Sequence, residues 1–223
     1  MHIPDGFLNN KAALGMLAGA LGMLAFCLSK VFRALAVMAG SLAGNNGNTG
    51  FGGVLGLSGG AGKYFRKMAV IAIWVFACQM FNIPIQSATS AHLIGGVFAA
   101  VLVGPFAGFV VISSVLIVQS LFFADGGILA LGANIINMAF VGSFLSYFIY
   151  KFFEKKNYYL AIAAACFFSV LGAALFCLIE LSLSATVSFT NAFGEMMKLH
   201  FFFAAFETLI TIGLLKLFKS WEI

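Results

Sequence analysis

Long apolar runs with almost no charge dominate this sequence, and several are long enough to cross a membrane. Only 9% of the residues are charged and 62% are hydrophobic, whereas soluble proteins average about 25% charged residues. A helix needs about 20 apolar residues to cross the ~30 Å hydrocarbon core of a bilayer. The 223 residues therefore predict an all-α, multi-pass membrane protein with about seven transmembrane helices and no separate soluble catalytic domain.

Charged residues, glycines and prolines divide this single membrane domain, residues 1–223, into its expected parts. The predicted spans are 11–28, 68–83, a short one ending at 103, 105–123, one that contains two asparagines and ends at 151, 158–183 and 199–218. Residues 44–62 are rich in Gly and Asn, a composition typical of a flexible linker. Residues 1–10 form a polar arm ahead of the first span.

The distribution of positive charge predicts the orientation. With the N-terminus outside, ten of the twelve Lys and Arg residues lie on the cytoplasmic side, and only Lys11 and Lys198 lie outside. The C-terminus is then cytoplasmic, and the linker 44–62 is too. His2, His92 and Asp125 share the outer face. Because the basic residues sit at span ends, the net charge of +5 reflects membrane topology, and we expect no nucleic-acid partner.

The arm contains donors for a metal chelate. The Met1 amine, the backbone nitrogen of His2 and its side-chain δ nitrogen can wrap one ion in two fused rings, and His92 is our candidate for the fourth planar position. Tetragonal nitrogen coordination suits Ni(II) or Cu(II), whereas Mg²⁺ and Ca²⁺ prefer oxygen ligands. The alternatives are that His2 tips a disordered terminus and that His92 is a hydrogen-bonded histidine at a helix start.

Other polar residues are candidates for supporting roles. Asp5 and Asp125 can orient a ligating imidazole from behind, or cap a neighbouring helix. Asn134 and Asn137 are three residues apart on one helix face, where they can support the site or form hydrogen bonds between helices.

Three further ionisable residues lie in apolar runs: His200, Glu207 and Glu180. They can form a proton path or a separate ion site, or they can be paired structurally. A proton path would make the chain a self-sufficient proton-coupled transporter or channel. The sequence has neither an HExxH zinc-protease motif nor a GxSxG elbow, so we expect no enzyme activity.

Three motifs together resemble one family. They are Met1-His2-Ile3-Pro4-Asp5-Gly6-Phe7-Leu8, Ala91-His92-Leu93-Ile94-Gly95-Gly96 with the following Gly104-Pro105, and the run from Phe123 to Asn134. In these the chain is similar to the NikM/CbiM family, the substrate-binding membrane components of energy-coupling-factor nickel and cobalt transporters. The resemblance implies seven helices, a location in a prokaryotic cell membrane, and ion capture by Met1, His2 and His92.

The resemblance also implies partners and a substrate. A transmembrane coupling subunit and two cytoplasmic ATPase subunits would drive translocation, together with an optional small accessory membrane subunit. Cobalt-type members tend to have a histidine where Asp125 stands and His-Pro-Thr-Gly where His92-Leu93-Ile94-Gly95 stands. These departures favour high-affinity Ni²⁺ import, with Co²⁺ import for cobalamin synthesis as the alternative. The ion is the transported ligand, and no organic cofactor is expected.

Overall fold

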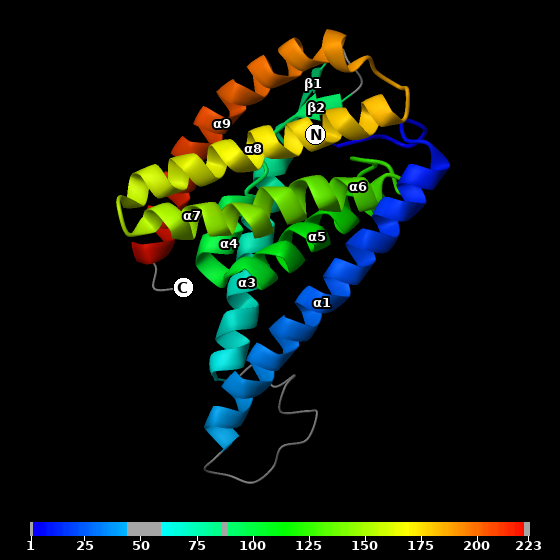
Figure 1. Ribbon diagram of the computed structural model, residues 1–223. Coiled ribbons are helices and arrows are strands. Elements are labelled where there is room, and N and C mark those ends of the chain that lie inside the picture. The colour runs from blue at the N-terminus through cyan, green and yellow to red at the C-terminus, as the bar shows by residue number, and fades with distance from the viewer. Residues whose placement is uncertain (1, 44–58, 86–88, 221–223) are drawn as a thin grey trace.

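The computed structural model describes residues 2–43, 59–85 and 89–220, and most of them are helical (Figure 1). In chain order the elements are α1 (Asn10–Ala43), α3 (Gly60–Gln79), β1 (Ile83–Ile85), β2 (Thr89–Ala91), α4 (Gly96–Val103), α5 (Pro105–Phe122), α6 (Leu131–Ile135), the π-helix η1 (Ile136–Leu145), α7 (Ser146–Glu154), α8 (Tyr158–Leu183) and α9 (Phe189–Ser220).

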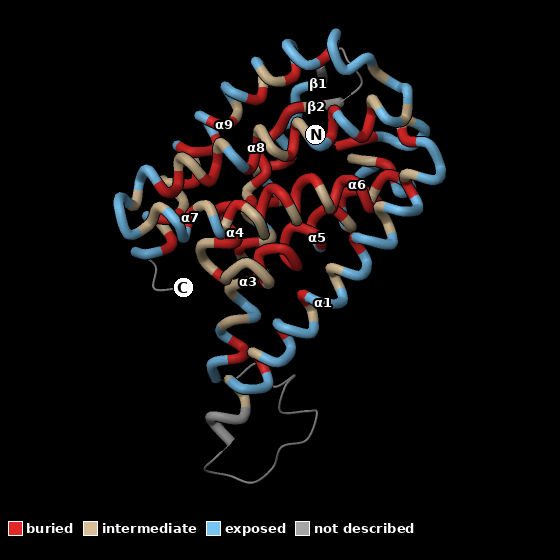
Figure 2. The backbone as a smooth tube through the Cα atoms, viewed as in Figure 1, coloured by how far each residue is buried: buried red, intermediate tan, exposed pale blue. Residues whose placement is uncertain are grey.

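The helices pack around a centre formed by α4, α5 and η1. Helix α8 packs against α9 on one side and against η1 and α7 on the other, while α1 runs along α5 and α6 (Figure 1). Burial follows this order, because α4 and α5 are mostly buried whereas α1 and α9 are largely exposed (Figure 2). The N-terminal arm, residues 2–9, meets α6 and the α8–α9 turn.

The structure supports a multi-pass membrane protein. Within the described ranges, five stretches are long and apolar enough to cross a membrane: Asn10–Ala39, Pro105–Phe122, Leu131–Glu154, Tyr158–Leu183 and Phe189–Ser220. The predicted spans 105–123 and 158–183 agree closely with α5 and α8. Helix α4 has eight residues and is about 12 Å long at 1.5 Å per residue, too short to cross alone.

Several predicted boundaries are wrong. Helix α1 continues unbroken to Ala43 instead of ending at residue 28. Helix α3 starts at Gly60, so residues 60–62 of the predicted linker are helical, while residues 44–58 lie outside the described structure. Helix α9 starts at Phe189 and includes a stretch that we had placed between spans.

One segment departs from the predicted all-α fold. Strands β1 and β2 pair in antiparallel register, with Ile83 opposite Ala91, where a helix ending at Pro84 was expected. Proline lacks an N–H donor, and the residue before it avoids helical backbone angles. Helix α3 therefore ends at Gln79, and the following residues form the hairpin that leads to His92.

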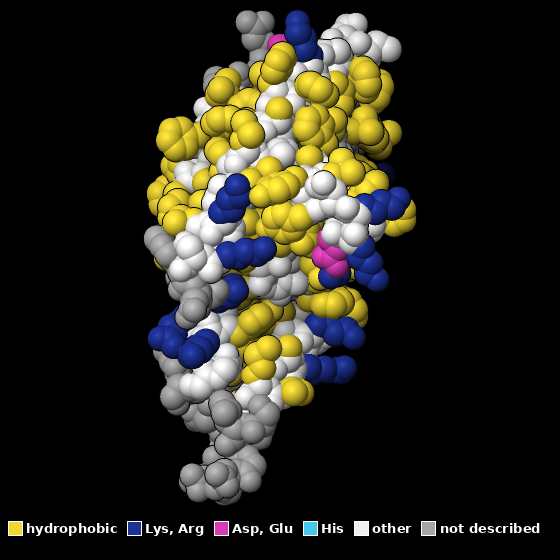
Figure 3. All heavy atoms as spheres, turned by 90° about the vertical axis from the view of Figure 1, so that its left-hand side faces the viewer, with side chains coloured by type: hydrophobic (Ala, Val, Ile, Leu, Met, Phe, Trp, Pro, Cys, Tyr) yellow, Lys and Arg dark blue, Asp and Glu magenta, His cyan; other side chains and the backbone are white. Residues whose placement is uncertain are grey.

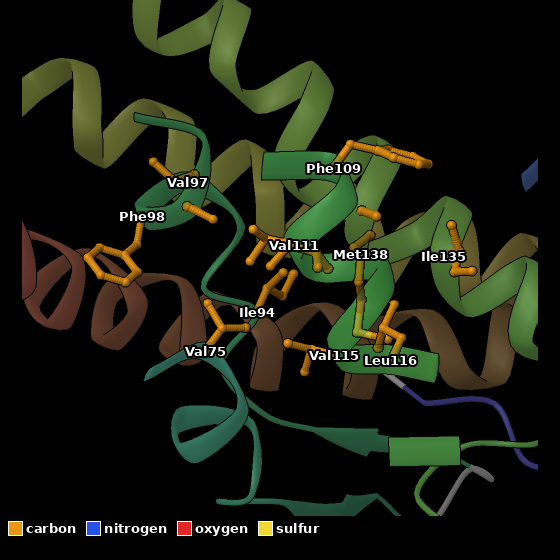
Figure 4. Close-up of a cluster of buried hydrophobic side chains, with 14 of the residues drawn as sticks. Val75, Ile94, Val97, Phe98, Phe109, Val111, Val115, Leu116, Ile135 and Met138 are labelled. Carbon is orange, nitrogen blue, oxygen red and sulfur yellow. The ribbon is translucent and has the colours of Figure 1, made fainter. Parts of the chain in front are cut away.

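Apolar side chains from several helices fill the centre of the bundle. Figure 4 shows Val111, Val115 and Leu116 of α5 beside Met138 of η1, and Ile94 beside Val75. On the outside, the face in Figure 3 has large hydrophobic surfaces, with most of its Lys and Arg side chains in the lower half. An apolar exterior with basic residues gathered near helix ends is typical of a protein embedded in a bilayer.

Gly132 is where α1 and α6 approach most closely, and its substitution tests this packing. A Cβ atom at Gly132 would lie 2.3 Å from the backbone nitrogen of Leu17, so Gly132→Ala must push the helices apart. We expect it to lower the free energy of unfolding by about 1–3 kcal/mol, measured by thermal unfolding in detergent. The control is Gly19→Ala on α1, where no atom lies within 4 Å. Equal effects of both substitutions would contradict the packing.

Candidate metal site

The N-terminal arm enters the bundle and is held immediately after His2. The side chain of His2 is 4% exposed and that of Ile3 is fully buried. The Ile3 N–H donates to Oδ1 of Asn134 at 2.8 Å, and Nδ2 of Asn134 donates to the Ile3 carbonyl at 3.2 Å. The Gly127 N–H donates to the same carbonyl at 2.9 Å. One carboxamide therefore pairs both backbone groups of Ile3, as a neighbouring strand would.

Asp5 fastens the arm to the loop that precedes α6. Its carboxylate accepts hydrogen bonds from the N–H groups of Ile128 at 3.1 Å and Leu129 at 2.7 Å. Gly127 makes this approach possible, because a Cβ atom there would lie 2.1 Å from Oδ1 of Asp5. These N–H groups belong to the turn before α6, and no side chain caps α6 itself, so the contacts do not match the predicted role of Asp5 as a helix cap.

The far end of the arm is fixed by the α8–α9 turn. The hydroxyl of Thr186 donates to the Phe7 carbonyl, and the Asn9 N–H donates to the Ser184 hydroxyl at 3.2 Å. Asn9 also accepts from the Ala12 N–H at 2.8 Å and so caps the start of α1. The arm is therefore fixed at both ends. The alternative prediction, that His2 lies at the tip of a disordered terminus, does not describe this structure.

His92 lies directly against His2. The two imidazole rings stack with centroids 4.5 Å apart and an interplanar angle of 18°. Nδ1 of His92 lies 2.8 Å from the Leu93 carbonyl, and because a carbonyl only accepts, this nitrogen carries the proton. Nε2 is buried and has no hydrogen-bond partner in the described structure. Its lone pair is therefore available to a ligand.

Burial favours the neutral form of both rings. Burial holds the pKa of His92 well below its usual value, and positive charge on His2 would lower it further. Burial also lowers the pKa of His2, although Asp125 partly offsets this. Neutral imidazole is the form that binds metal ions.

Asp125 contacts His2 at the nitrogen that was predicted to ligate. Nδ1 of His2 lies 3.0 Å from Oδ1 of Asp125, and Asn82 donates to the same oxygen at 3.4 Å. Burial alone would raise the pKa of Asp125, but the hydrogen bond and charge of His2 lower it below its usual value. Met1, the other predicted ligand on the arm, lies outside the described residues.

Sequence reasoning missed Gln119. This α5 residue is fully buried, and neither polar atom of its carboxamide has a hydrogen-bond partner of ordinary geometry among the described residues. It nevertheless lies close enough to the His2 ring to raise the pKa of that ring. The signal was available, since a glutamine near the end of an apolar span, six residues before Asp125, is costly to bury without a role.

The remaining predicted polar residues have separate partners. Nδ2 of Asn137 donates to Glu180 at 2.7 Å, so the two asparagines on one helix face point to different neighbours. Nδ1 of His200 lies 2.7 Å from the Met196 carbonyl. Glu207 accepts from backbone N–H groups near His92. Of these, only Glu207 contacts the loop that carries His92.

A cleft of about 570 Å³ opens beside His2. It is lined by His2, Pro4, Asp5, Phe7, Asn82, Ser90, Ser120, Ala124, Asp125, Gly126, Gly127 and Ile128. Nowhere in residues 2–43, 59–85 and 89–220 do three His, Cys, Asp or Glu side chains gather closely enough to hold a metal ion. An ion at His2 and His92 would therefore need further donors of another kind.

Comparison with known proteins identifies the family. The family described as "Cobalt uptake substrate-specific transmembrane region", CbiM, matches residues 56–222. This chain belongs to the CbiM family. A solved structure titled as a transition metal transporter superposes with a TM-score of 0.81 at 30% identity, covering 100% of this chain and 95% of that one.

Two curated relatives are named for the transport of different metals. A putative fused nickel transport protein NikMN of Archaeoglobus fulgidus is 35% identical over 85% of this chain and 55% of its own length. A cobalt transport protein CbiM of Thermosipho melanesiensis is 39% identical over 45% of this chain and 43% of its own length. The matched region thus spans about half the length of these relatives. The resemblance to nickel and cobalt transport proteins is confirmed.

The pKa of His2 can be tested by titration in this CbiM-family chain. Burial favours neutral His2 in the docked arm, so an undocked arm takes up its proton at higher pH. Docking should therefore weaken as the pH falls below ~6.5. The three histidines give three ring signals in ¹⁵N-histidine NMR, and His2→Ala identifies one of them. We expect the His2 ring to titrate below a peptide of residues 1–8; equal values would contradict the buried site.

The clamp on Ile3 can be tested by amide hydrogen exchange. Asn134→Leu leaves the Ile3 N–H without a partner, at a cost of about 1–3 kcal/mol, while the Ile3 carbonyl keeps the hydrogen bond from the Gly127 N–H. We expect the Ile3 amide to exchange at least roughly tenfold faster. The matched control is Asn137→Leu, which removes the same side chain one turn later and frees Glu180 instead. A similar increase in both variants would argue against a specific clamp.

Proposed function

We propose that this chain captures Ni²⁺ with high affinity and translocates it as the substrate-specific component of a metal importer. The observation that carries the proposal is the buried pair of His2 and His92, with Nε2 of His92 free to ligate. Metal-transport names among the relatives and the solved structure support it. The chain binds and moves an ion, and catalyses no reaction itself.

The proposed ligands are the Met1 amine, the backbone and δ nitrogens of His2, and Nε2 of His92. Ion capture requires Nδ1 of His2 to exchange Asp125 for the metal, because that nitrogen now lies 3.0 Å from the carboxylate. Binding through the backbone nitrogen of His2 releases an amide proton, so the bound unit retains one net positive charge. Asp125 is placed to compensate that charge at short range.

The candidate donors favour nickel. A planar set of nitrogens suits Ni(II), and main-chain donors are needed here because the side chains supply only two imidazoles. The A. fulgidus relative is named for nickel. Cobalt is the alternative substrate, since the family description names cobalt uptake.

The proposed topology places the N-terminal arm outside and the C-terminus in the cytoplasm, with about seven helices in the membrane. The arm docks at the start of α6 and the α8–α9 turn, whereas Lys155, Lys156 and Lys219 lie near the other ends of α8 and α9. This separation supports positive charge on the inner side. The part of the chain between α1 and α3 is then cytoplasmic.

Energy for import would come from partners: a transmembrane coupling subunit and two cytoplasmic ATPase subunits. The sequence has no phosphate-binding P-loop of its own. A proton path through His200, Glu207 and Glu180 is the competing proposal. In the described structure these three side chains bond to Met196, to the loop after His92 and to Asn137, with no hydrogen bond between them.

The chelate predicts an unusual sensitivity to extension of the N-terminus. Adding one or two residues before Met1 removes the free amine from its position while leaving both histidines intact. We expect Ni²⁺ affinity, measured by calorimetry, to fall by more than roughly 100-fold. Loss of a residue that only orients a metal ligand costs at most about that much, whereas this extension removes a ligand. His92→Ala should also bind more weakly.

A control extension belongs at the C-terminus, which lies outside the proposed site, and should leave the affinity unchanged. Wild-type affinity in the N-terminally extended protein would exclude the amine as a ligand. Ni²⁺ uptake into vesicles by this chain alone, driven by a pH gradient, would favour the proton-coupled alternative.

A further inference from the structure

The loop that carries His92 has no regular secondary structure. It links β2, which ends at Ala91, to α4, which begins at Gly96. Leu93 is 5% exposed, and His92 and Ile94 are fully buried. Irregular backbone that is buried inside a protein needs other partners for its N–H and C=O groups, because unpaired polar groups are costly to bury.

Side chains from two different helices supply these partners. The Ile94 N–H donates to Oε2 of Glu207 at 2.9 Å, and the Gly95 N–H donates to Oε1 of Glu207 at 2.7 Å. From the other side, Nε2 of Gln79 donates to the Ile94 carbonyl at 2.7 Å. Glu207 of α9 and Gln79 of α3, hereafter the clasp, therefore hold the loop two residues after His92.

The position of Glu207 is costly unless it has such a role. Its side chain is 2% exposed within the apolar stretch Phe189–Ser220, where a carboxyl group is rare and usually functional. No Lys, Arg or His forms an ion pair with it among the described residues. Both of its oxygens are used by the loop backbone, so its contacts are directed at the segment that carries His92.

Side-chain packing constrains the loop in addition to the clasp. Ile94 lies beside Val75 in the apolar core (Figure 4). Gly95 has a φ of +70°, and a Cβ atom there would lie 2.9 Å from Val75, so glycine is required at this turn. The loop is thus shaped by packing on one side and by the clasp on the other.

We propose that Glu207 is a positioning residue for His92: through the clasp it sets the direction of Nε2 toward the captured ion. This inference rests on the proposed function. It also ties ion affinity to the relative position of α3 and α9, because each helix supplies one half of the clasp. A small displacement between the two helices would withdraw His92 without any change in the N-terminal arm.

The test combines Ni²⁺ affinity with the visible absorption of bound Ni²⁺. Glu207→Gln keeps the size of the side chain but replaces one accepting oxygen by an NH₂ group facing a backbone N–H. We expect affinity to fall roughly 10–100-fold, as for other residues that orient metal ligands, and the absorption band to shift toward that of His92→Ala. The matched control is Glu180→Gln, the other buried carboxyl group, which bonds to Asn137 and should preserve both readouts.

Each outcome decides the proposal. Weaker binding with the His92→Ala spectrum supports the clasp. Unchanged affinity overturns it, and so does weaker binding with the wild-type spectrum, which would show a general loss of stability. If Glu207→Gln does not fold, Gln79→Met decides by the same two readouts. A wild-type protein that binds Ni²⁺ without the band of planar nitrogen coordination would instead overturn the proposed function, and the clasp with it.

Discussion

The pairing of Asn134 with Ile3 is the interaction on which the candidate site depends. A chain end carries backbone N–H and C=O groups that cost several kcal/mol each if they enter a low-dielectric interior without partners. The Asn134 carboxamide satisfies both groups of Ile3 at once. His2 can therefore be buried next to His92, and a polar terminus becomes part of the bundle.

The same physical solution recurs around the site. Asp5 accepts from the backbone of the loop before α6, and Glu207 accepts from the backbone after His92. In each case a polar side chain supplies the hydrogen-bond partner that a helix or strand would otherwise provide. The candidate site is built from irregular segments, and side chains on regular helices fix their shape.

The sequence predicted the parts of this arrangement that depend on the lengths of apolar runs. These lengths located α5 and α8 almost to the residue. The β1–β2 hairpin and the π-helix were not predicted, because runs of apolar residues do not specify local backbone geometry. Asn134 lies in α6 and Asn137 in the π-helix η1, which begins at Ile136, so spacing alone does not give the direction of Asn137.

Contacts between distant residues were the least accessible from sequence. Glu207 was recognised as a membrane carboxyl group that could belong to a proton path, an ion site or a structural pair, but its partner, a loop more than 100 residues earlier, was not predicted. Gln119 received no role at all. Residue type and position in the sequence show that such residues are energetically costly to bury. Only the packing of the helices shows which group forms the compensating hydrogen bond.

Prior docking of the arm explains how so few side chains can provide tight capture. Ordering a flexible backbone costs about 1–2 kcal/mol per residue, so fixing residues 2–9 at the moment of binding would consume on the order of 10 kcal/mol of the ion's binding energy. In this structure Asn134, Asp5 and Thr186 already hold the arm. In the proposed site the ion would still have to displace Asp125 from one histidine nitrogen and release the amide proton of His2, but it would not have to order the arm.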